Sequence, residues 1–333
     1  MKISGKKLFA CLLISLLVIS TMAGCGSSGG SSGGSSGGGG AKILFIMTDT
    51  NDTFRGLLAD GIVAAGQSQG VTLDMIETGD SVQDQLTAIT EAKGKGYTAI
   101  ILRSADANTA PQMNVASNDL PIIYVNAEPI KDHLEADKYI YVGSDELQSG
   151  QYQAEYVLKK LGNPKSMNAI IFQGEAGHSA TLGRTKAVKR TLKAAGCNVN
   201  YVFVDTANWS DTEAAEKFGI FMKTGQSVDA IFCNNDTMAL GAIEGMKKYG
   251  LDYTKIPVCG IDATSDACAS ILAGEMQFTV LQDAKNQGAS AVMAAKVLGS
   301  GGSLADVEGS TDDLKYVYVP FVPVDSSNAS QYK

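Results

Sequence analysis

Cysteine is scarce in this sequence, tryptophan occurs once, and no basic run follows the first residues. The cysteines beyond position 40 are Cys197, Cys233, Cys259 and Cys268. They show no C-x-x-C spacing and no histidine at zinc-like intervals, so these cysteines are not expected to bind zinc. No metal site and no cofactor is expected in this chain. We interpret them as small buried apolar residues and leave open a disulfide between neighbouring strands.

The first 40 residues carry a targeting pattern. Three lysines precede an apolar run over 8–19, which is shorter than a membrane span, and small residues follow it. This pattern resembles a bacterial lipoprotein signal, in which residues 1–24 are removed and Cys25 carries the lipid. Residues 25–40 then form a glycine and serine tether. The alternative is an ordinary secretory leader with a chance cysteine.

No second apolar run is long enough to cross a membrane. The formal net charge of −8 becomes −11 once the three leader lysines are removed. Such acidity disfavours nucleic-acid binding and attraction to an anionic bilayer. We therefore expect an extracytoplasmic protein that a lipid, rather than its surface charge, anchors to the cell membrane.

Apolar runs alternate with helical patterns from position 41 to the end, which is more chain than one compact core usually holds. The expected strands cover 42–47, 71–76, 98–102, 121–125, 139–142, 169–172, 201–204, 230–233, 257–261 and 278–281. Helical spacing of apolar residues, as at Phe54, Leu57, Leu58 and Ile62, separates most of them. This order predicts an α/β fold with two doubly wound parallel sheets.

Polar and aromatic side chains follow the expected strands. Because ligands of open parallel sheets bind outside the carboxyl ends of the strands, these side chains should meet at one edge. Carboxylates, amides, one arginine and one histidine can pair with sugar hydroxyls, and an aromatic ring can cover a sugar face. The alternative is that such residues are turn formers and helix caps, which we favour for Asp49, Asn51, Asn234 and Asp236.

Seven blocks of sequence match a known family in order and spacing. They are 125–129 (VNAEP), 141–145 (YVGSD), 174–178 (GEAGH), 205–209 (DTANW), 234–242 (NNDTMALGA), 256–263 (IPVCGIDA) and 279–284 (TVLQDA). The chain resembles the periplasmic galactose/glucose-binding proteins of sugar ABC transporters, within the type I pentose/hexose solute-binding family. The resemblance implies that a sugar contacts Asp52, Phe54, Asn126, His178, Arg184, Trp209, Asn235, Asp262 and Gln282.

The sequence departs from that family pattern at several positions. Ala180 stands where the family has an aspartate near the anomeric end of the sugar, and Gln282 is typical of the ribose-binding relatives. The connection at 161–166 lacks the acidic residues of the family's calcium loop, so no calcium is expected. Arg55 and Arg103 stand near the cleft where neutral residues are usual in the family. An anionic or modified sugar is therefore an alternative ligand.

The resemblance implies two lobes joined by a three-segment hinge. The first would comprise 41–143 plus 284–318, and the second 144–283 plus 319–333. We expect a monomer that captures a hexose such as galactose or glucose and delivers it to the membrane subunits of an ABC permease. A sensor that presents its closed form to a membrane receptor is the alternative. No carboxylate pair suited to glycoside hydrolysis is evident, so an enzyme is not expected.

Overall fold

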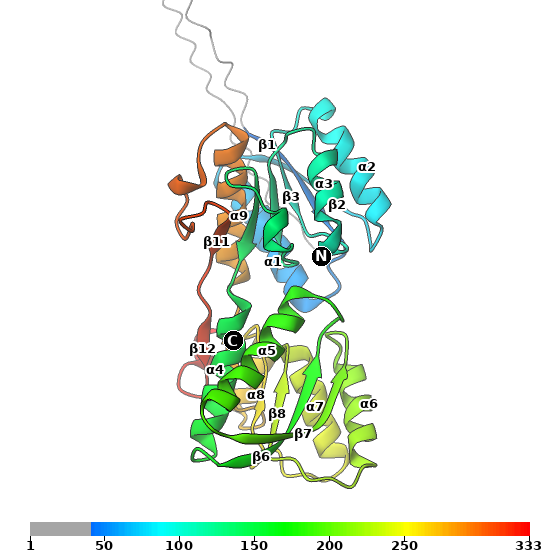
Figure 1. Cartoon of the computed structure of the whole chain (residues 1–333), viewed down its shortest axis with the longest axis vertical. Helices are drawn as coiled ribbons and strands as arrows, with labels where there is room; N and C mark the ends of the chain where they lie inside the picture. Colours follow the sequence, from blue (N-terminus) through cyan, green and yellow to red (C-terminus); the bar gives the residue numbers. More distant parts are fainter. Residues whose placement is uncertain (1–40) are drawn as a thin grey trace, which may run out of the picture. The chain divides into compact units, whose positions relative to one another are not determined.

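The computed structural model describes residues 41–333. The expected signal segment, Cys25 and the tether lie outside these residues. Strands and helices alternate along most of the described chain and build two parallel sheets and one small antiparallel sheet (Figure 1). The expected α/β fold with parallel sheets is confirmed. None of the described helices is long and apolar enough to cross a membrane.

Six parallel strands form the first sheet, in the order β11-β5-β4-β3-β1-β2. The strands are β1 (Lys42–Met47), β2 (Thr72–Glu77), β3 (Ala99–Leu102), β4 (Ile122–Val125), β5 (Tyr139–Gly143) and β11 (Tyr316–Tyr318). The helices are α1 (Thr53–Ser68), α2 (Val82–Ala92), α3 (Ala110–Ala116) and α9 (Ala284–Gly299). Short 3₁₀ turns lie at Lys93–Lys95, Ala107–Thr109, Lys131–His133 and Leu304–Asp306. We call this sheet with its helices the first lobe.

Four parallel strands form the second sheet, in the order β7-β6-β8-β9. The strands are β6 (Ser166–Gln173), β7 (Asn198–Thr206), β8 (Ala230–Cys233) and β9 (Val258–Cys259). The helices are α4 (Glu146–Lys160), α5 (Ser179–Ala194), α6 (Asp211–Met222), α7 (Asp236–Lys248) and α8 (Ser265–Leu272), and a 3₁₀ turn lies at Ala329–Gln331. We call this sheet with its helices the second lobe.

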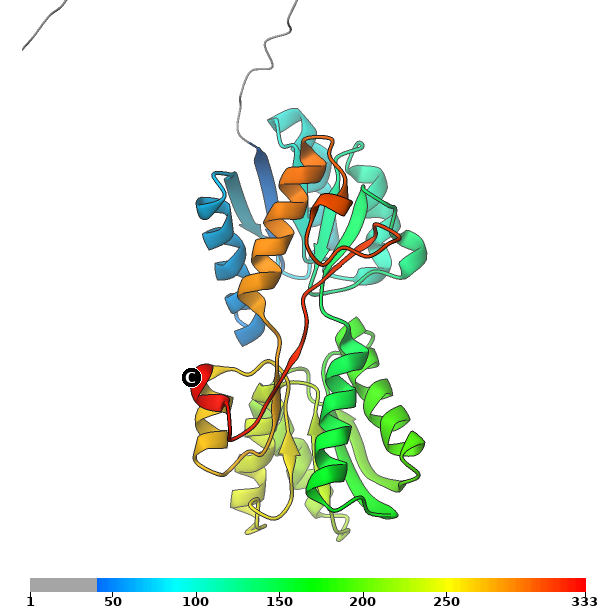
Figure 2. The ribbon, with the colours of Figure 1, turned by 90° about the vertical axis from the view of Figure 1, so that its left-hand side faces the viewer.

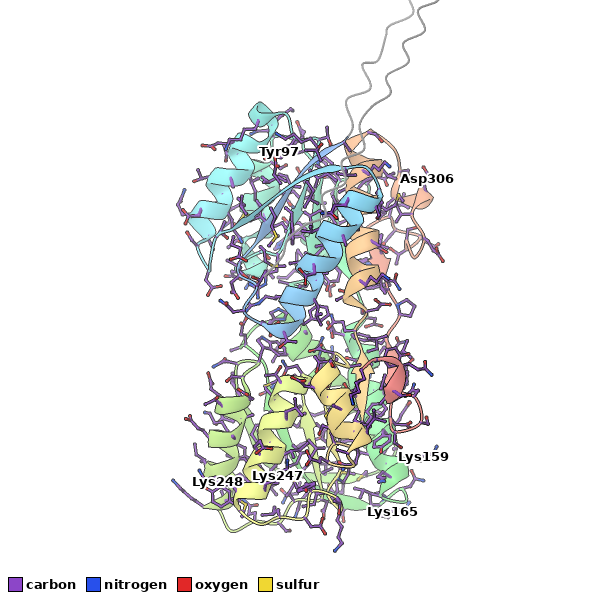
Figure 3. The ribbon with its side chains drawn as sticks, turned by 180° about the vertical axis from the view of Figure 1, so that it is seen from behind. Tyr97, Lys159, Lys165, Lys247, Lys248 and Asp306 are labelled. Carbon is purple, nitrogen blue, oxygen red and sulfur yellow. The ribbon has the colours of Figure 1, made fainter. Side chains whose placement is uncertain are left out.

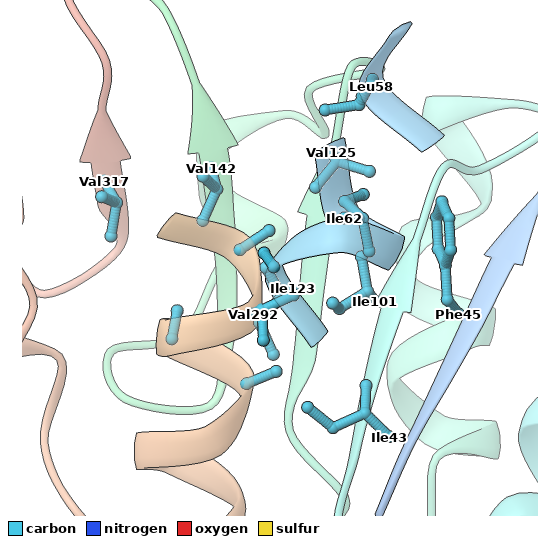
Figure 4. Packing of buried hydrophobic residues seen from close by; sticks show 14 of the residues in the cluster. Ile43, Phe45, Leu58, Ile62, Ile101, Ile123, Val125, Val142, Val292 and Val317 are labelled. Carbon is cyan, nitrogen blue, oxygen red and sulfur yellow. The ribbon is translucent and has the colours of Figure 1, made fainter. Parts of the chain in front are cut away.

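Helices cover both faces of the first sheet because its central strands are apolar at nearly every position. Phe45 belongs to the layer that contains Ile62 of α1 and Val292 of α9, which Figure 4 shows from close by. Its neighbour Ile46 points to the opposite face, into a layer with residues of α2 and α3. Each fully buried side chain of this size contributes roughly 1.5–3 kcal/mol, so these layers fix the sheet that positions the site.

The chain passes between the two lobes three times (Figure 2). β5 leads into α4, β10 (Thr279–Leu281) leads into α9, and β11 is followed by β12 (Val322–Val324). Strands β10 and β12 pair in an antiparallel arrangement. Ser144 Oγ donates to the Val319 carbonyl oxygen at 2.6 Å and accepts from Gln287 Nε2 at 2.9 Å. Hydrogen bonds therefore join all three connections.

Several expected elements differ in extent. The strand expected over 257–261 is only β9, because the chain then pairs with the β10 segment: the Gly260 and Asp262 amides donate to carbonyl oxygens there. Leu57, expected on the buried face of α1, is 47% exposed. Tyr249 lies just beyond the end of α7 and is 42% exposed.

The four cysteines of the described chain are buried free thiols, which confirms their interpretation as small apolar residues. Cys233 and Cys259 lie on the neighbouring strands β8 and β9. Burial raises the pKa of the Cys233 thiol well above its usual range, so this thiol stays protonated and unreactive.

Candidate functional site

One cavity is lined by side chains from both lobes. Its lining residues are Asp52, Phe54, Arg55, Arg103, Asn126, His178, Ala180, Arg184, Trp209, Asn235, Asp262 and Gln282. All nine residues that the resemblance implies as sugar contacts are among them. The other three, Arg55, Arg103 and Ala180, are departures from the family pattern. The four polar residues that we interpreted as structural do not line this cavity.

Three helices begin at the cavity, and each is capped by one of the expected site residues. Asp52 Oδ1 accepts from the Arg55 amide at 2.9 Å, His178 Nδ1 accepts from the Ala180 amide at 3.2 Å, and Asn235 Oδ1 accepts from the Met238 amide at 2.9 Å. Capping and ligand binding are therefore compatible at Asp52 and His178, because each cap uses one atom and leaves the other polar atom of the side chain free. Asn235 Nδ2 already donates to the Trp209 carbonyl oxygen at 3.4 Å.

The helices of the second lobe share one direction. Glu146 at the start of α4 and Asn235 at the start of α7 lie at or next to the cavity. The last turns of these helices carry Lys159 and Lys247, which Figure 3 shows at the end of the lobe remote from the first lobe. Lysines are favourable at helix C-termini, and the N-termini give the cavity a positive local potential.

The wall from the second lobe pairs its charges closely. Arg184 of α5 is 3% exposed, and its Nε donates to Glu146 Oε2 at 2.6 Å while its Nη2 donates to Oε1 at 3.2 Å. Nη2 also donates to Gln282 Oε1 at 2.8 Å, and Nη1 donates to the carbonyl oxygen of Asn234. This two-point pairing compensates a buried cation and holds the guanidinium in one orientation.

Asp262 faces the same wall with an unused oxygen. Its Oδ1 lies 3.8 Å from Arg184 Nη1 and has no hydrogen-bond partner among the described residues. Burial raises the pKa of Asp262 well above its usual range, although Arg184 opposes this shift. Because an unpaired buried acceptor is costly, this oxygen is suited to accept a hydrogen bond from a ligand hydroxyl.

The wall from the first lobe pairs its charges loosely. Arg103 follows β3 and is 3% exposed. Its Nε donates to Asn126 Oδ1 at 3.3 Å and its Nη1 donates to the Ser104 carbonyl oxygen at 3.2 Å. Its nearest carboxylate is Glu175 of the second lobe, at 3.6 Å from Nη2, which is longer than a hydrogen bond.

Arg55 in the first turn of α1 is the second cation of this wall. Its Nη2 lies 3.3 Å from Asp49 Oδ1, and its Nε lies 4.0 Å from Asp52 Oδ1. That Nε is buried and has no hydrogen-bond partner among the described residues. The first-lobe wall therefore presents donors that the protein itself does not satisfy.

His178 is neutral in this setting. Burial lowers its pKa to about 3, and the charges of Arg103, Arg184 and Arg55 act in the same direction. Since Nδ1 accepts from the Ala180 amide, the proton sits on Nε2. The imidazole therefore offers the cavity one hydrogen-bond donor.

Two aromatic rings line the cavity, Trp209 from the second lobe and Phe54 from the first. The Trp209 ring meets the His178 ring edge to face, with centroids 5.4 Å apart. A Cβ at Gly174 would collide with the Trp209 ring, so only glycine fits beneath it. Phe54 also belongs to the core of the first lobe, so the core and cavity interpretations of this residue both hold.

Three cavity residues have a left-handed backbone that side chains rarely adopt. The φ angles are 61° at Asn126, 64° at Trp209 and 125° at Asp262. Each residue directly or closely follows the end of a strand, where the chain turns sharply. Such conformations cost about 1–3 kcal/mol each and persist where the surrounding structure holds them.

Glu146 is the supporting residue that the sequence did not reveal. An acidic residue in the first turn of a helix is usual, so the pattern indicated only a favourable helix start. Its partner Arg184 lies on another helix, 38 positions later.

Asn234, one of the residues interpreted as structural, is buried, and its Oδ1 accepts from the Gly174 amide at 3.2 Å. Asp236 is the first residue of α7 rather than a cap, and its Oδ2 accepts from the Thr264 amide at 2.8 Å.

No group of histidine, cysteine and acidic residues within 41–333 could hold a metal ion.

Comparison with known proteins shows the family to which the chain belongs. Residues 43–303 match the family described as periplasmic binding protein domain. The chain belongs to this family, among the type I sugar-binding periplasmic proteins of ABC transporters. Its relatives are solute-binding proteins rather than enzymes, and the family location is extracytoplasmic.

Three relatives show how far the likeness extends. A Rhizobium meliloti protein named for rhizopine binding is 31% identical over 287 residues, covering 85% of this chain and 89% of that protein. The D-galactose/methyl-galactoside binding periplasmic protein MglB of Haemophilus influenzae is 30% identical over 278 residues, covering 79% and 82%. A Bacillus halodurans solute binding protein with bound myo-inositol superposes with a TM-score of 0.77 at 27% identity, covering 88% and 97%.

Proposed function

We propose that this protein captures one monosaccharide between its two lobes and delivers it to the membrane subunits of an ABC permease. The observation that carries the proposal is the convergence of nine polar and aromatic side chains, from both lobes, on one cavity. Sugar hydroxyls both donate and accept. The cavity offers free acceptors on Asp52 and Asp262 and donors on Asn126, His178 and Arg184, next to aromatic rings that can cover a ring face.

The proposed ligand is a six-membered ring, a hexose such as galactose or glucose. These two sugars differ at the 4-hydroxyl, which we place at Asp52, because a carboxylate can accept from adjacent hydroxyls and rejects an epimer that leaves one group unpaired. Asp52 Oδ1 caps α1, so Oδ2 remains for the ligand. The relative from Haemophilus influenzae is named for galactose binding.

A cyclitol such as myo-inositol is the second candidate ligand, and Ala180 favours it. This position supplies a methyl group to the cavity where the galactose/glucose pattern has a carboxylate near the anomeric hydroxyl. A cyclitol has no anomeric hydroxyl, which is the group that this carboxylate binds in the galactose/glucose pattern, so the alanine removes no contact specific to that hydroxyl. The Bacillus halodurans structure contains myo-inositol, in support of this candidate.

We further propose that the lobes, comprising 41–143 plus 284–318 and 144–283 plus 319–333, close about the three connections when ligand binds. The hydrogen bonds of Ser144 to Val319 and Gln287 support a joint hinge, because they make the connections move together. Small-angle scattering should show a smaller radius of gyration at saturating ligand, and identical profiles would contradict closure.

We also propose that a lipid on Cys25 anchors the protein to the membrane.

A thermal-shift panel tests the ligand class. Galactose, glucose, myo-inositol and ribose are compared with an acyclic hexitol as the control for non-specific polyol effects. A ligand at one hundred times its Kd stabilises the native state by about 2.7 kcal/mol, so a true ligand should raise the melting temperature by several degrees. Shifts no larger than those of the acyclic control for every ring compound would contradict the proposal.

A further inference from the structure

Two cations of the first lobe lie in the same cavity. Arg55 comes from the first turn of α1 and Arg103 from the end of β3, and both line the cavity. They are close enough to influence each other: burial lowers the pKa of Arg103, and the charge of Arg55 lowers it further. A second cation next to a buried one is unfavourable unless something anionic compensates both.

The protein compensates these two cations only in part. The carboxylate of Glu175 stays 3.6 Å from Arg103 Nη2, and its side chain is 40% exposed, so solvent weakens this pairing. Asp49 contacts Arg55 at 3.3 Å, but the buried Arg55 Nε remains without a hydrogen bond among the described residues. Arg184, by contrast, is held by a carboxylate at 2.6 Å.

The neighbouring polar groups add donors rather than acceptors. Asn126 uses its Oδ1 to accept from Arg103, so its Nδ2 is left to donate. His178 uses Nδ1 for the cap of α5, so its Nε2 is left to donate. Ala180 lines the cavity with a methyl group and brings no carboxylate. Apart from Asp52, this part of the cavity therefore presents hydrogen-bond donors without matching acceptors from the chain.

We propose that Arg55 and Arg103 form a subsite for an oxyanion carried by the bound ring polyol, either a carboxylate or a phosphate. The planar guanidinium fork matches both groups at two points, which a ring hydroxyl cannot do. The oxyanion takes the place of the distant Glu175 as the partner of Arg103 and pairs with Arg55 Nε. This inference rests on the proposed capture of a ring polyol in the same cavity.

The overall negative charge of the protein cannot itself attract an anionic ligand. A chain with a formal net charge of −8 repels anions at long range, so tighter binding of an anionic sugar requires a local site. The exposed lysines that Figure 3 shows on the second lobe lie at its remote end and cannot serve this purpose.

Calorimetric titration of matched pairs tests the inference. The pairs are galactose with galacturonate, glucose with glucuronate, and galactose with galactose 6-phosphate. We expect at least one oxyanionic member to bind about tenfold or more tightly than its neutral parent, as a charge-assisted hydrogen-bond pair allows. In Arg55→Gln and Arg103→Gln this preference should fall to near unity, whereas the affinity for the neutral parent changes less.

The controls separate this inference from the proposed function. Arg190→Gln removes an exposed arginine of α5 and should keep the wild-type preference. Arg103→Lys keeps the charge and should keep part of the preference, and Arg55→Gln covers the case in which an Arg103 variant fails to fold. Neutral ring polyols that bind as tightly as their oxyanionic partners would overturn the subsite alone. Failure of every neutral and anionic ring compound to bind would overturn the proposed function as well.

Discussion

Two arginines of this protein are equally buried and differently paired. Arg184 and Arg103 are each 3% exposed. Arg184 has a carboxylate at 2.6 Å that meets it at two points, whereas the carboxylate nearest to Arg103 is 3.6 Å away on a half-exposed side chain of the other lobe. Burial alone therefore does not show how much hydrogen-bonding capacity a charged side chain keeps for a ligand. The completeness of its hydrogen-bonded partners does, so Arg184 keeps little of this capacity and Arg103 keeps more.

The two walls should differ most in how much stability is lost when one of their charged residues is removed, and Glu146 should show the largest loss. Glu146→Ala should lower the free energy of unfolding by about 3–5 kcal/mol, because it leaves the buried Arg184 without its hydrogen-bonded carboxylate. Urea denaturation at neutral pH measures this loss. Arg55→Gln should cost less than about 1 kcal/mol, since it removes a loosely paired cation. Equal losses in the two variants would remove the distinction between the walls.

A matched control comes from an exposed pair of α7. Glu244 meets Lys247 at 2.9 Å, with side chains 67% and 32% exposed. Glu244→Ala should change stability by no more than about 0.5 kcal/mol, because solvent screens the pair. A loss near that of Glu146→Ala would show that the assay reports charge removal in general.

Ligand binding should depend strongly on Trp209, the single tryptophan of the chain. Trp209→Ala should weaken binding of the best ring polyol by about 1–3 kcal/mol, because it removes an aromatic surface from the cavity. Calorimetry measures the change, and Trp209→Phe, which keeps an aromatic ring, should lose less. An unchanged affinity in the alanine variant would remove Trp209 from the site.

Burial, together with the charges of the neighbouring arginines, also predicts a pH effect at His178. Its pKa is about 3 in the folded protein and near 6.5 in an unfolded chain, so between these values the unfolded state binds the extra proton. Wild type should therefore lose up to about 2 kcal/mol relative to His178→Gln between pH 7 and pH 5. Urea unfolding of both proteins at the two pH values checks this. A constant difference between them would mean that the histidine is not held neutral.

The smallest expected change in ligand affinity concerns Ala180, which is 3% exposed in the first turn of α5. Ala180→Asp should raise the affinity for free galactose and glucose several-fold, since a carboxylate at a helix N-terminus is favourable and can accept from the anomeric hydroxyl. Methyl glycosides, in which that hydroxyl is blocked, should gain nothing. Calorimetric titration of both sets decides, and an absent gain for free hexoses would contradict the assignment of this end of the cavity.

Much of the fold follows from local sequence, because strands buried on both faces have continuous apolar runs, as in β3 and β4. The candidate site follows from the same strands, since polar residues at their carboxyl ends must meet. The Glu146–Arg184 pair could not be predicted, because it depends on how α4 packs on α5. The dual use of Asp52 as cap and cavity residue was also hidden, because sequence patterns present the two roles as alternatives.

The most direct measurement is an equilibrium titration of the wild-type protein with galactose, myo-inositol and ribose, followed by Trp209 fluorescence. A six-membered ring polyol bound in the cavity should change the emission in a saturable way, with one site per chain, and should bind more tightly than ribose. Unchanged emission with both six-membered rings, or tighter binding of ribose, would contradict the assignment of this cavity.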